Sequence, residues 1–166
     1  MKISAIVITK NEEKMIRNCL KSISFADEII VVDTGNTDKT NSIAKKSGAR
    51  IVKYAGIGSF ADWRNNGLKS AVGDWIIYLD ADERVTKELK DELLDKLPDT
   101  KFNAYAVARR NFIFGKEFHH SGNTLIIKRE FLERKILLNG QEMFMKSQAL
   151  KESLVIWKIH YYTTKR

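Results

Sequence analysis

The chain has little of what usually assigns a protein to a class at once. Its 166 residues include a single cysteine, Cys19, so no disulfide can form within the chain, as is usual in a reducing cytoplasm. We expect Cys19 to be a small buried helix residue rather than a nucleophile, because no partner base is evident. No apolar run approaches the roughly 18 residues that a membrane span needs. The first apolar run ends at Ile8 and polar residues follow it at once, which is not the layout of a signal peptide.

Two widespread nucleotide-binding motifs are absent as well. The chain contains neither G-x-G-x-x-G nor G-x-x-x-x-G-K-[ST], which disfavours a dinucleotide-binding site and a P-loop. No recognised nucleic-acid-binding motif is present, so only the positive charge would support nucleic acid as a partner. We therefore expect no nucleic acid among the partners.

The positive charge is confined to the C-terminal part of the chain. The net charge is +8, and residues 101–166 hold 13 basic and 5 acidic residues, whereas residues 1–100 are balanced. This asymmetry favours an anionic partner, such as a phosphorylated acceptor or an anionic membrane surface. A solvated basic surface without a partner is the alternative. The length fits one globular domain.

Short and long apolar segments alternate along the first hundred residues. Short β-branched runs predict strands, and longer segments with apolar residues at helical spacing predict helices between them. The predicted strands are 3–8, 28–32, 50–53 and 75–79, and the predicted helices are 11–22, about 37–47, 61–71 and 86–97. Strand-like runs follow at 104–108, 125–128 and 154–159. This order predicts an α/β fold, a mostly parallel sheet with helices on both faces and a short mixed-strand C-terminal part.

Polar residues follow three of these strands at the point where each ends. The fourth strand runs into Asp80 and Asp82, the second into Asp33, and the first into Thr9 and Asn11. The carboxyl ends of parallel strands share one edge of a sheet, so we expect these side chains to lie close together. Two carboxylates one residue apart suit Mg²⁺ or Mn²⁺. Turns also collect Asp for structural reasons alone, and that alternative stays open for a lone D-x-D.

Four linked segments give the chain a family resemblance. They read IVITKNEE (6–13), EIIVVDTGNTDKT (28–40), FADWRNNGL (60–68) and YLDADE (78–83). In this order and spacing they resemble the family 2 glycosyltransferases of the GT-A fold. Within that family the chain is most similar to the lipopolysaccharide core β-glucosyltransferases. The resemblance covers residues 1–100 and thins beyond them.

The resemblance implies a nucleotide pocket at the ends of the first two strands. Thr9, Asn11 and Glu12 would line this pocket, with Glu12 near the base or ribose. Asp33 would hold the uracil or ribose of a UDP-sugar.

The resemblance also implies a metal and diphosphate site. Asp82 would ligate a divalent cation, Mg²⁺ or Mn²⁺, and Asp80 would support the cation or contact the ribose. Arg64 would bridge the diphosphate and the Asp80 carboxylate, a use that suits an always-charged planar guanidinium. The metal would neutralise charge on the departing UDP.

The catalytic base is expected in the second half of the chain. The resemblance implies an inverting reaction, which needs a carboxylate that deprotonates the acceptor hydroxyl. The nearest match to the family's segment for this residue is residues 139–142, which nominates Glu142. A loop or helix-surface glutamate without a catalytic role is the alternative for Glu142. His160 is a candidate metal ligand, and His119 and His120 fall where the family has a loop near the acceptor and diphosphate.

The predicted function is that of a metal-dependent inverting glycosyltransferase. It would move a hexose from a UDP-sugar, or another nucleotide-sugar, to a glycan or lipid-linked acceptor in cell-envelope polysaccharide or lipopolysaccharide synthesis. Residues 1–100 would bind the nucleotide-sugar, and residues 101–166 would form the acceptor side of the same domain. The expected location is cytoplasmic, with peripheral association at the inner face of an anionic membrane.

Two alternatives remain from the sequence. One is a truncated, non-catalytic module that binds a nucleotide or an anionic surface. The other is a nucleotidyltransferase, which would require a Gly-rich N-terminal loop with Arg and Lys that the first strand does not supply.

Overall fold

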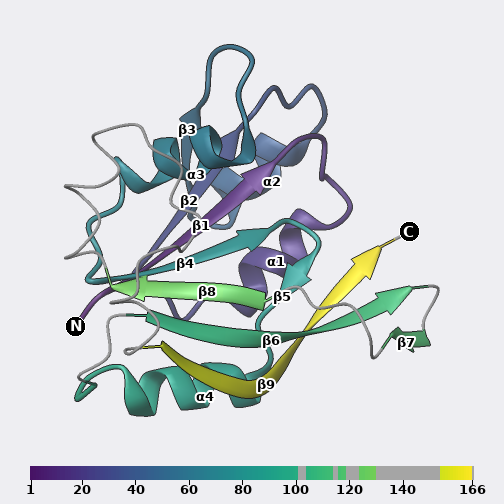
Figure 1. Cartoon of the computed structure of the whole chain (residues 1–166). Coiled ribbons are helices and arrows are strands. Elements are labelled where there is room, and N and C mark those ends of the chain that lie inside the picture. Colours follow the sequence, from purple (N-terminus) through teal and green to yellow (C-terminus); the bar gives the residue numbers. More distant parts are fainter. Residues whose placement is uncertain (101–103, 114–115, 119–123, 130–153, 166) are drawn as a thin grey trace.

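The computed structural model describes residues 1–100, 104–113, 116–118, 124–129 and 154–165 of the chain (Figure 1). Within these residues, nine strands form one sheet. The strands are β1 (Ile3–Thr9), β2 (Glu28–Asp33), β3 (Arg50–Lys53), β4 (Trp75–Asp80), β5 (Glu83–Arg84), β6 (Ala104–Ile113), β7 (Lys116–Phe118), β8 (Thr124–Arg129) and β9 (Leu154–Lys165). The helices are α1 (Ile16–Ser22), α2 (Thr40–Lys46), α3 (Phe60–Leu68) and α4 (Lys87–Lys96).

The sheet has a parallel half and a mixed half. Its strand order is β3-β2-β1-β4-β8-β6-β9-β5, and β7 pairs with β6 outside this path. The first four strands in this order are parallel, as expected for a chain that alternates strands and helices. Beyond β4, β8 is antiparallel to both β4 and β6, β9 is parallel to β6, and β5 is antiparallel to β9. The α/β fold with a mixed-strand C-terminal part, predicted from the sequence, is therefore confirmed.

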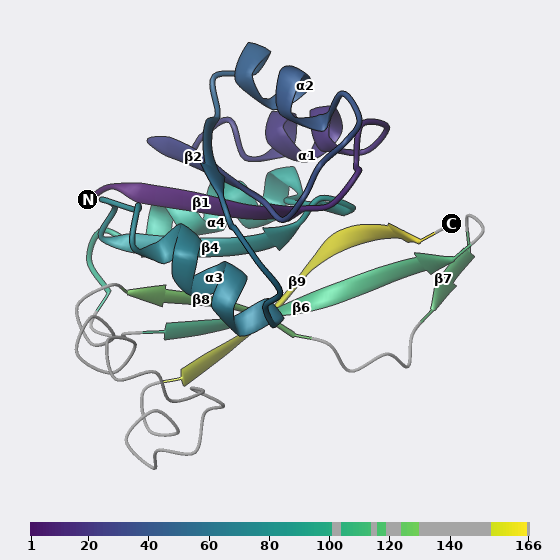
Figure 2. The same cartoon turned by 90° about the horizontal axis from the view of Figure 1, so that it is seen from above.

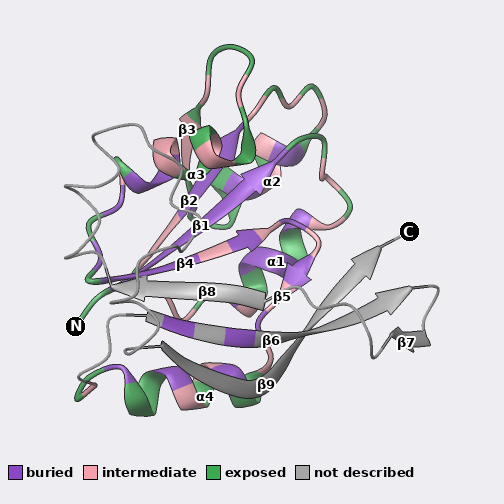
Figure 3. Ribbon diagram, in the orientation of Figure 1, coloured by how far each residue is buried: buried purple, intermediate pink, exposed green. Residues whose placement is uncertain are grey.

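Helices cover both faces of the parallel half. Figure 2 shows α1 and α2 on one side of β1 and β4, and α3 on the other. Alternate residues of each central strand supply the two apolar layers that result, since successive side chains point to opposite faces. Figure 3 shows that β1 is buried along its length. Strands that are buried on both faces read as continuous apolar runs, which is why these strands are visible in the sequence.

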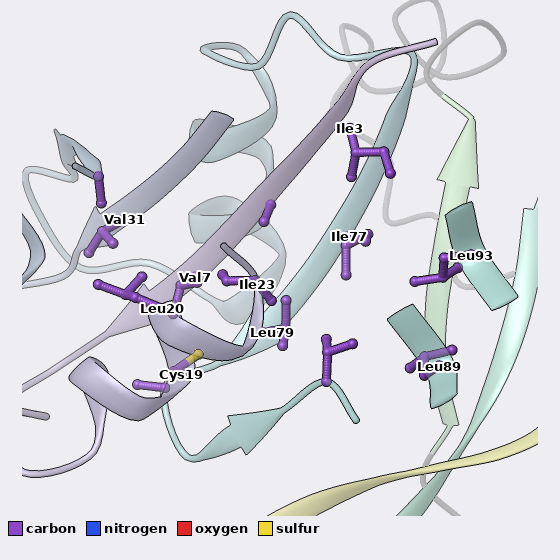
Figure 4. Close-up of a cluster of buried hydrophobic side chains, with 14 of the residues drawn as sticks. Ile3, Val7, Cys19, Leu20, Ile23, Val31, Ile77, Leu79, Leu89 and Leu93 are labelled. Carbon is purple, nitrogen blue, oxygen red and sulfur yellow. The ribbon is translucent and has the colours of Figure 1, made fainter. Parts of the chain in front are cut away.

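The larger apolar layer lies under α1 and α4. It includes Leu20 of α1 and Ile23 directly after it, Leu89 and Leu93 of α4, and the strand residues between them (Figure 4). Cys19 belongs to this layer and is fully buried, as its expected role required. Among the residues described here, no helix is long and apolar enough to cross a membrane.

The smaller apolar layer lies under α3 and depends on a close helix–sheet approach. A methyl group on Gly67 of α3 would lie 2.5 Å from Ile6 Cγ2 and 2.9 Å from Val32 Cγ2. Only glycine allows α3 to come this close to β1 and β2. Ser59 caps the helix: its side chain accepts the N–H of Asp62, while the Asp62 carboxylate accepts the N–H of Ser59, a capping box.

Some predicted boundaries were right and others were wrong. β3 has its predicted bounds, and Thr86 caps α4 by accepting the Leu89 N–H, as expected. α1 begins at Ile16 rather than at residue 11, because Asn11 has a left-handed φ of 58° that a helix cannot contain. α2 begins at Thr40 rather than near Thr37, since the Thr37 N–H and hydroxyl bond to Asn11 instead. The short strands β5 and β7 were missed.

Candidate functional site

Three polar strand ends lie side by side at one edge of the sheet. Thr9 at the end of β1 pairs with Asp33 at the end of β2, and Ile8 pairs with Asp80 at the end of β4. Figure 1 shows β1 and β4 pointing in the same direction, towards this edge. Neighbouring strands are about 4.8 Å apart, so these strand ends lie within roughly 10 Å of one another. The prediction that the three strand ends meet is confirmed.

The loop after β1 is held to the loop after β2 by reciprocal hydrogen bonds. The Asn11 N–H donates to Asn36 Oδ1 at 2.7 Å, and Asn11 Oδ1 accepts the Thr37 N–H at 2.8 Å. The Glu12 N–H donates to Thr40 Oγ1 at 2.8 Å. The Asn11 and Glu12 main chain is therefore fixed before any ligand binds, which reduces the ordering cost of binding.

Asp33 is a buried carboxylate at the end of β2 on this edge. Its Oδ1 accepts the N–H groups of Gly35 and Asn36 at 2.9 and 2.7 Å, and its Oδ2 accepts the Asn41 amide at 2.7 Å. Burial raises the pKa of the Asp33 carboxyl, but the bonds from Asn36, Asn41 and Gly35 outweigh burial and hold the pKa below its ordinary value. Asp33 is thus an anion that also shapes the β2 loop. A carboxylate has about four acceptor positions, so a ligand donor can still be accommodated.

Thr9 is buried beneath the same loop. Its hydroxyl donates to the Val32 carbonyl at 3.1 Å and accepts the Asn36 amide at 2.8 Å. Its carbonyl accepts both the N–H and the hydroxyl of Thr34. The Thr9 side chain therefore stabilises the loop after β2. The sequence pattern alone does not distinguish this structural role from contact with a ligand.

The D-x-D segment forms a tight turn between β4 and β5. Asp80 and Asp82 are both partly exposed, whereas Ala81 between them is buried. The Asp80 N–H donates to Oε2 of Glu83, a carboxylate that is only 1% exposed, at 2.8 Å. The Cys19 thiol lies 3.7 Å from the Asp80 carbonyl oxygen. The turn therefore presents two carboxylates on a main chain that is held from below.

Arg64 lies on α3, on the face of the sheet towards which Asp80 is directed. Ile76 and Tyr78 belong to the layer under α3, and strand alternation places Asp80 on the same face. Arg64 is exposed, and within the described ranges no ion pair joins it to Asp80. The Arg64–Asp80 bridge therefore stays a prediction for the ligand-bound protein.

The donor set of the turn fits a hard divalent cation that binds together with a substrate. Among the described residues, no group of three or more His, Cys, Asp or Glu side chains could hold a metal ion. Mg²⁺ does not need such a group, because one or two carboxylates combined with substrate phosphates and water satisfy its coordination. Asp80 and Asp82 offer that pair of carboxylates.

The C-terminal candidates are placed only in part. His160 lies in β9, whose residues Tyr162 and Thr163 pair with Arg84 and Glu83 of β5. In this antiparallel register His160 lies at a position beyond the end of β5 that leads into α4, away from Asp82. Glu142, His119 and His120 lie outside the described residues.

Several polar residues around the site were missed by the sequence prediction. Glu83 directly follows the D-x-D and was read only as the last residue of the YLDADE segment, and Arg84 after it was not considered. On α3, Trp63 Nε1 and Asn66 Oδ1 are buried, and neither has a hydrogen-bond partner within the described part of the chain. A buried polar atom without a partner lowers stability, so these two atoms are candidate ligand contacts. Periodicity could reveal that α3 packs on the sheet, but not that it carries these atoms inward.

The family model described as "Glycosyl transferase family 2" matches residues 4–155. An uncharacterized glycosyltransferase of Rickettsia conorii is 43% identical over 98 residues, which cover 55% of this chain and 33% of that protein. The lipopolysaccharide core biosynthesis glycosyltransferase LpsC of Rhizobium meliloti is 28% identical over 158 residues, which cover 92% of this chain and 57% of LpsC. The chain thus spans between a third and three fifths of the length of these relatives.

Two enzymes with the same fold have been solved in complex with a UDP-sugar. Residues 1–349 of Staphylococcus aureus TarS in complex with UDP-GlcNAc superpose with a TM-score of 0.78 at 22% identity, over 100% of this chain and 59% of that one. Glucosyl-3-phosphoglycerate synthase of Mycobacterium tuberculosis, in complex with Mn²⁺, UDP-glucose and phosphoglyceric acid, superposes with a TM-score of 0.73 at 17% identity, over 99% of this chain and 72% of that one. At these identities the likeness establishes a shared fold.

Proposed function

The chain belongs to glycosyl transferase family 2, and from that premise we propose that it transfers a hexose from a UDP-sugar to a glycan or lipid-linked acceptor. The observation that carries the proposal is the convergence of Thr9, Asp33 and the D-x-D turn at one edge of the sheet. Ligands of open α/β sheets bind outside the carboxyl ends of the strands. The name of LpsC supports a role in lipopolysaccharide core synthesis, which we propose as the pathway.

The nucleoside end of the donor would bind over β1 and β2. Asp33 is ionised and fixed by three hydrogen bonds, so it offers an oriented acceptor for a ribose hydroxyl or the uracil N–H. The main chain at Asn11 and Glu12 lies beside it and is held in place by the β2 loop. We propose that Thr9, Asn11 and Glu12 complete this pocket.

The diphosphate end would bind over the D-x-D turn. We propose that Asp82, with support from Asp80, holds Mg²⁺ or Mn²⁺ together with the diphosphate, as the Mn²⁺ and UDP-glucose in the M. tuberculosis enzyme suggest. A cation bound there neutralises the charge that develops on the UDP leaving group. Arg64 on α3 would bind the diphosphate from the face of the sheet that Asp80 shares.

The acceptor side of the reaction rests on the C-terminal part of the chain. We propose that residues 101–166 bind the acceptor and that Glu142 removes the proton of the attacking hydroxyl, with inversion at the anomeric carbon. The pairing of β9 with β5 places His160 away from Asp82, so we assign the cation to Asp82 and Asp80 alone. The 13 basic residues of this part suit an anionic acceptor or the anionic inner face of the cytoplasmic membrane.

A thermal-shift screen of nucleotide-sugars tests the proposal. A ligand that binds the native state raises the unfolding temperature by mass action, so UDP-sugars with Mn²⁺ should stabilise the protein and Mn²⁺ alone should not to the same extent. Asp82→Asn should remove this stabilisation. Asp91→Asn makes the same charge change on the exposed surface of α4 and should keep it. Equal stabilisation of both variants would place the cation elsewhere.

A further inference from the structure

The Arg84 guanidinium donates to three main-chain carbonyls, two in the D-x-D turn and one just before α1. Its Nη1 donates to the carbonyls of Ala81 and Glu83 at 2.8 and 2.6 Å, and its Nη2 donates to the Met15 carbonyl at 2.8 Å. Ala81 is the middle residue of the turn. Met15 precedes the first residue of α1, at the end of the loop that carries Asn11 and Glu12. One guanidinium therefore joins the two loops that face the site.

Glu83 holds the same turn through a buried carboxylate. The side chain is 1% exposed, and its Oε2 accepts the N–H of Asp80 at 2.8 Å. Burying a carboxylate is unfavourable unless it is hydrogen-bonded, and the bond from the Asp80 N–H meets that need. The buried Glu83 carboxylate therefore fixes the position of the Asp80 main chain. Together with the Cys19 thiol beside the Asp80 carbonyl, these side chains bind the main chain of Asp80 at both its N–H and its carbonyl.

The spacing between the two loops matters because one donor molecule must bind both. In the proposed function the nucleoside end would lie over the β1 and β2 loops, and the diphosphate end would lie over the turn after β4. A rigid scaffold that fixes both ends avoids the ordering cost at binding, and small displacements of such a scaffold cost large factors in affinity or rate.

We propose that Arg84 and Glu83 are positioning residues that hold the Asp80–Asp82 turn and the β1–α1 loop at the spacing of a nucleoside diphosphate. They touch neither the donor nor the cation in this role. The inference rests on the proposed function, and it adds that the two halves of the donor site are coupled through Arg84 rather than formed independently.

Calorimetric titration of UDP with saturating Mn²⁺ into the wild type and three variants tests the inference. Arg84→Met should raise the dissociation constant of UDP by roughly tenfold or more, as loss of a supporting contact does in metal sites. The Mn²⁺ concentration needed for half-maximal binding, followed by the EPR signal of free Mn²⁺, should rise with it. UMP lacks the second phosphate and engages the turn less, so its affinity should fall by a smaller factor.

Arg50→Met is the matched control. Arg50 also bonds a main-chain carbonyl, that of Ser70, together with the Glu28 carboxylate, but it lies where β3 begins, at the opposite edge of the sheet. Its variant should lose stability while the UDP affinity of the folded protein stays within about twofold of the wild type. A merely structural Arg84 would behave in the same way as Arg50, and that result would overturn the inference.

Arg84→Lys keeps the inference testable if Arg84→Met fails to fold. Lysine keeps the charge but lacks the planar fork that reaches three carbonyls. A folded Arg84→Lys protein with weakened UDP and Mn²⁺ binding supports the inference, and one with wild-type binding refutes it. Failure of the wild-type protein to bind UDP is a separate result, which counts against the proposed function.

Discussion

Asp33→Asn separates the structural and ligand-binding roles of the most deeply buried acidic side chain among the three strand ends. In the wild type the carboxylate accepts two main-chain N–H groups on one oxygen and the Asn41 amide on the other. An asparagine can keep the first pair with its carbonyl, but its NH₂ group then faces the NH₂ group of Asn41. Asn41 cannot simply rotate its amide, because its Oδ1 already accepts the Asn36 amide at 3.1 Å.

The expected loss of stability follows from this mismatch. One buried donor loses its acceptor, and the remaining bonds lose the assistance of a charge, so the free energy of unfolding at pH 7 should fall by about 2 kcal/mol. The pKa of Asp33 is lowered in the folded state, so its contribution is present above the unfolded-state pKa and is lost as the pH falls through the folded-state pKa. The gap between wild type and variant should therefore narrow in acid.

Urea denaturation at a series of pH values measures this gap, and UDP titration of the folded variant measures the second role. We expect the variant to bind UDP more weakly even where it is fully folded, because an amide is a poorer acceptor for the ribose or base. If the wild type and Asp33→Asn have the same free energy of unfolding at pH 7, or if their difference widens as the pH falls, the account of Asp33 is refuted.

Three further predictions concern the scaffold. Glu28→Gln should lower the free energy of unfolding by about 1–2 kcal/mol near neutral pH. Burial raises the pKa of Glu28, but bonds from Ser4, Val72 and Arg50 outweigh burial and hold the pKa below its ordinary value. Denaturation curves should show the loss shrinking below the unfolded-state pKa, and a loss independent of pH would contradict this cause. Gly67→Ala gains about 1 kcal/mol of helix propensity but places a methyl group against Ile6 and Val32, which costs about 1–3 kcal/mol through overpacking. The variant should therefore be no more stable than the wild type. A more stable variant in the same assay would show that α3 can move away from the sheet freely. Cys19 is fully buried and burial raises its pKa to about 12, so a thiol reagent should label it only after unfolding, and rapid labelling of the native protein would contradict its placement.

The sequence predicts the parallel half of the fold well because the central strands are apolar along most of their length. Ile3–Thr9 and Trp75–Asp80 are recognisable without any tertiary information. Thr86 is equally clear, since a capping hydroxyl and the N–H that it binds are three residues apart. The strand ends follow from the same signals, which is why Asp33 and Asp80 could be placed at one edge.

What the sequence cannot show depends on residues that are distant along the chain. The left-handed turn at Asn11 is stabilised by Asn36 and Thr37, and the resulting loop shortens α1 from its predicted start. Arg84 bonds Met15 across 69 positions, so no local pattern separates it from an ordinary surface arginine. The two-residue strand β5 exists because β9 pairs with it, and β9 lies at the far end of the chain.

The central claim is that the edge formed by Thr9, Asp33 and the D-x-D turn binds a nucleoside diphosphate together with a divalent cation. Calorimetric titration of UDP into the wild-type protein, with Mn²⁺ and then with the cation removed by a chelator, tests it most directly. The account predicts saturable one-to-one binding with Mn²⁺ that weakens by roughly tenfold or more without it. Absence of UDP binding with Mn²⁺ and with Mg²⁺, or binding that is indifferent to the cation, would contradict it.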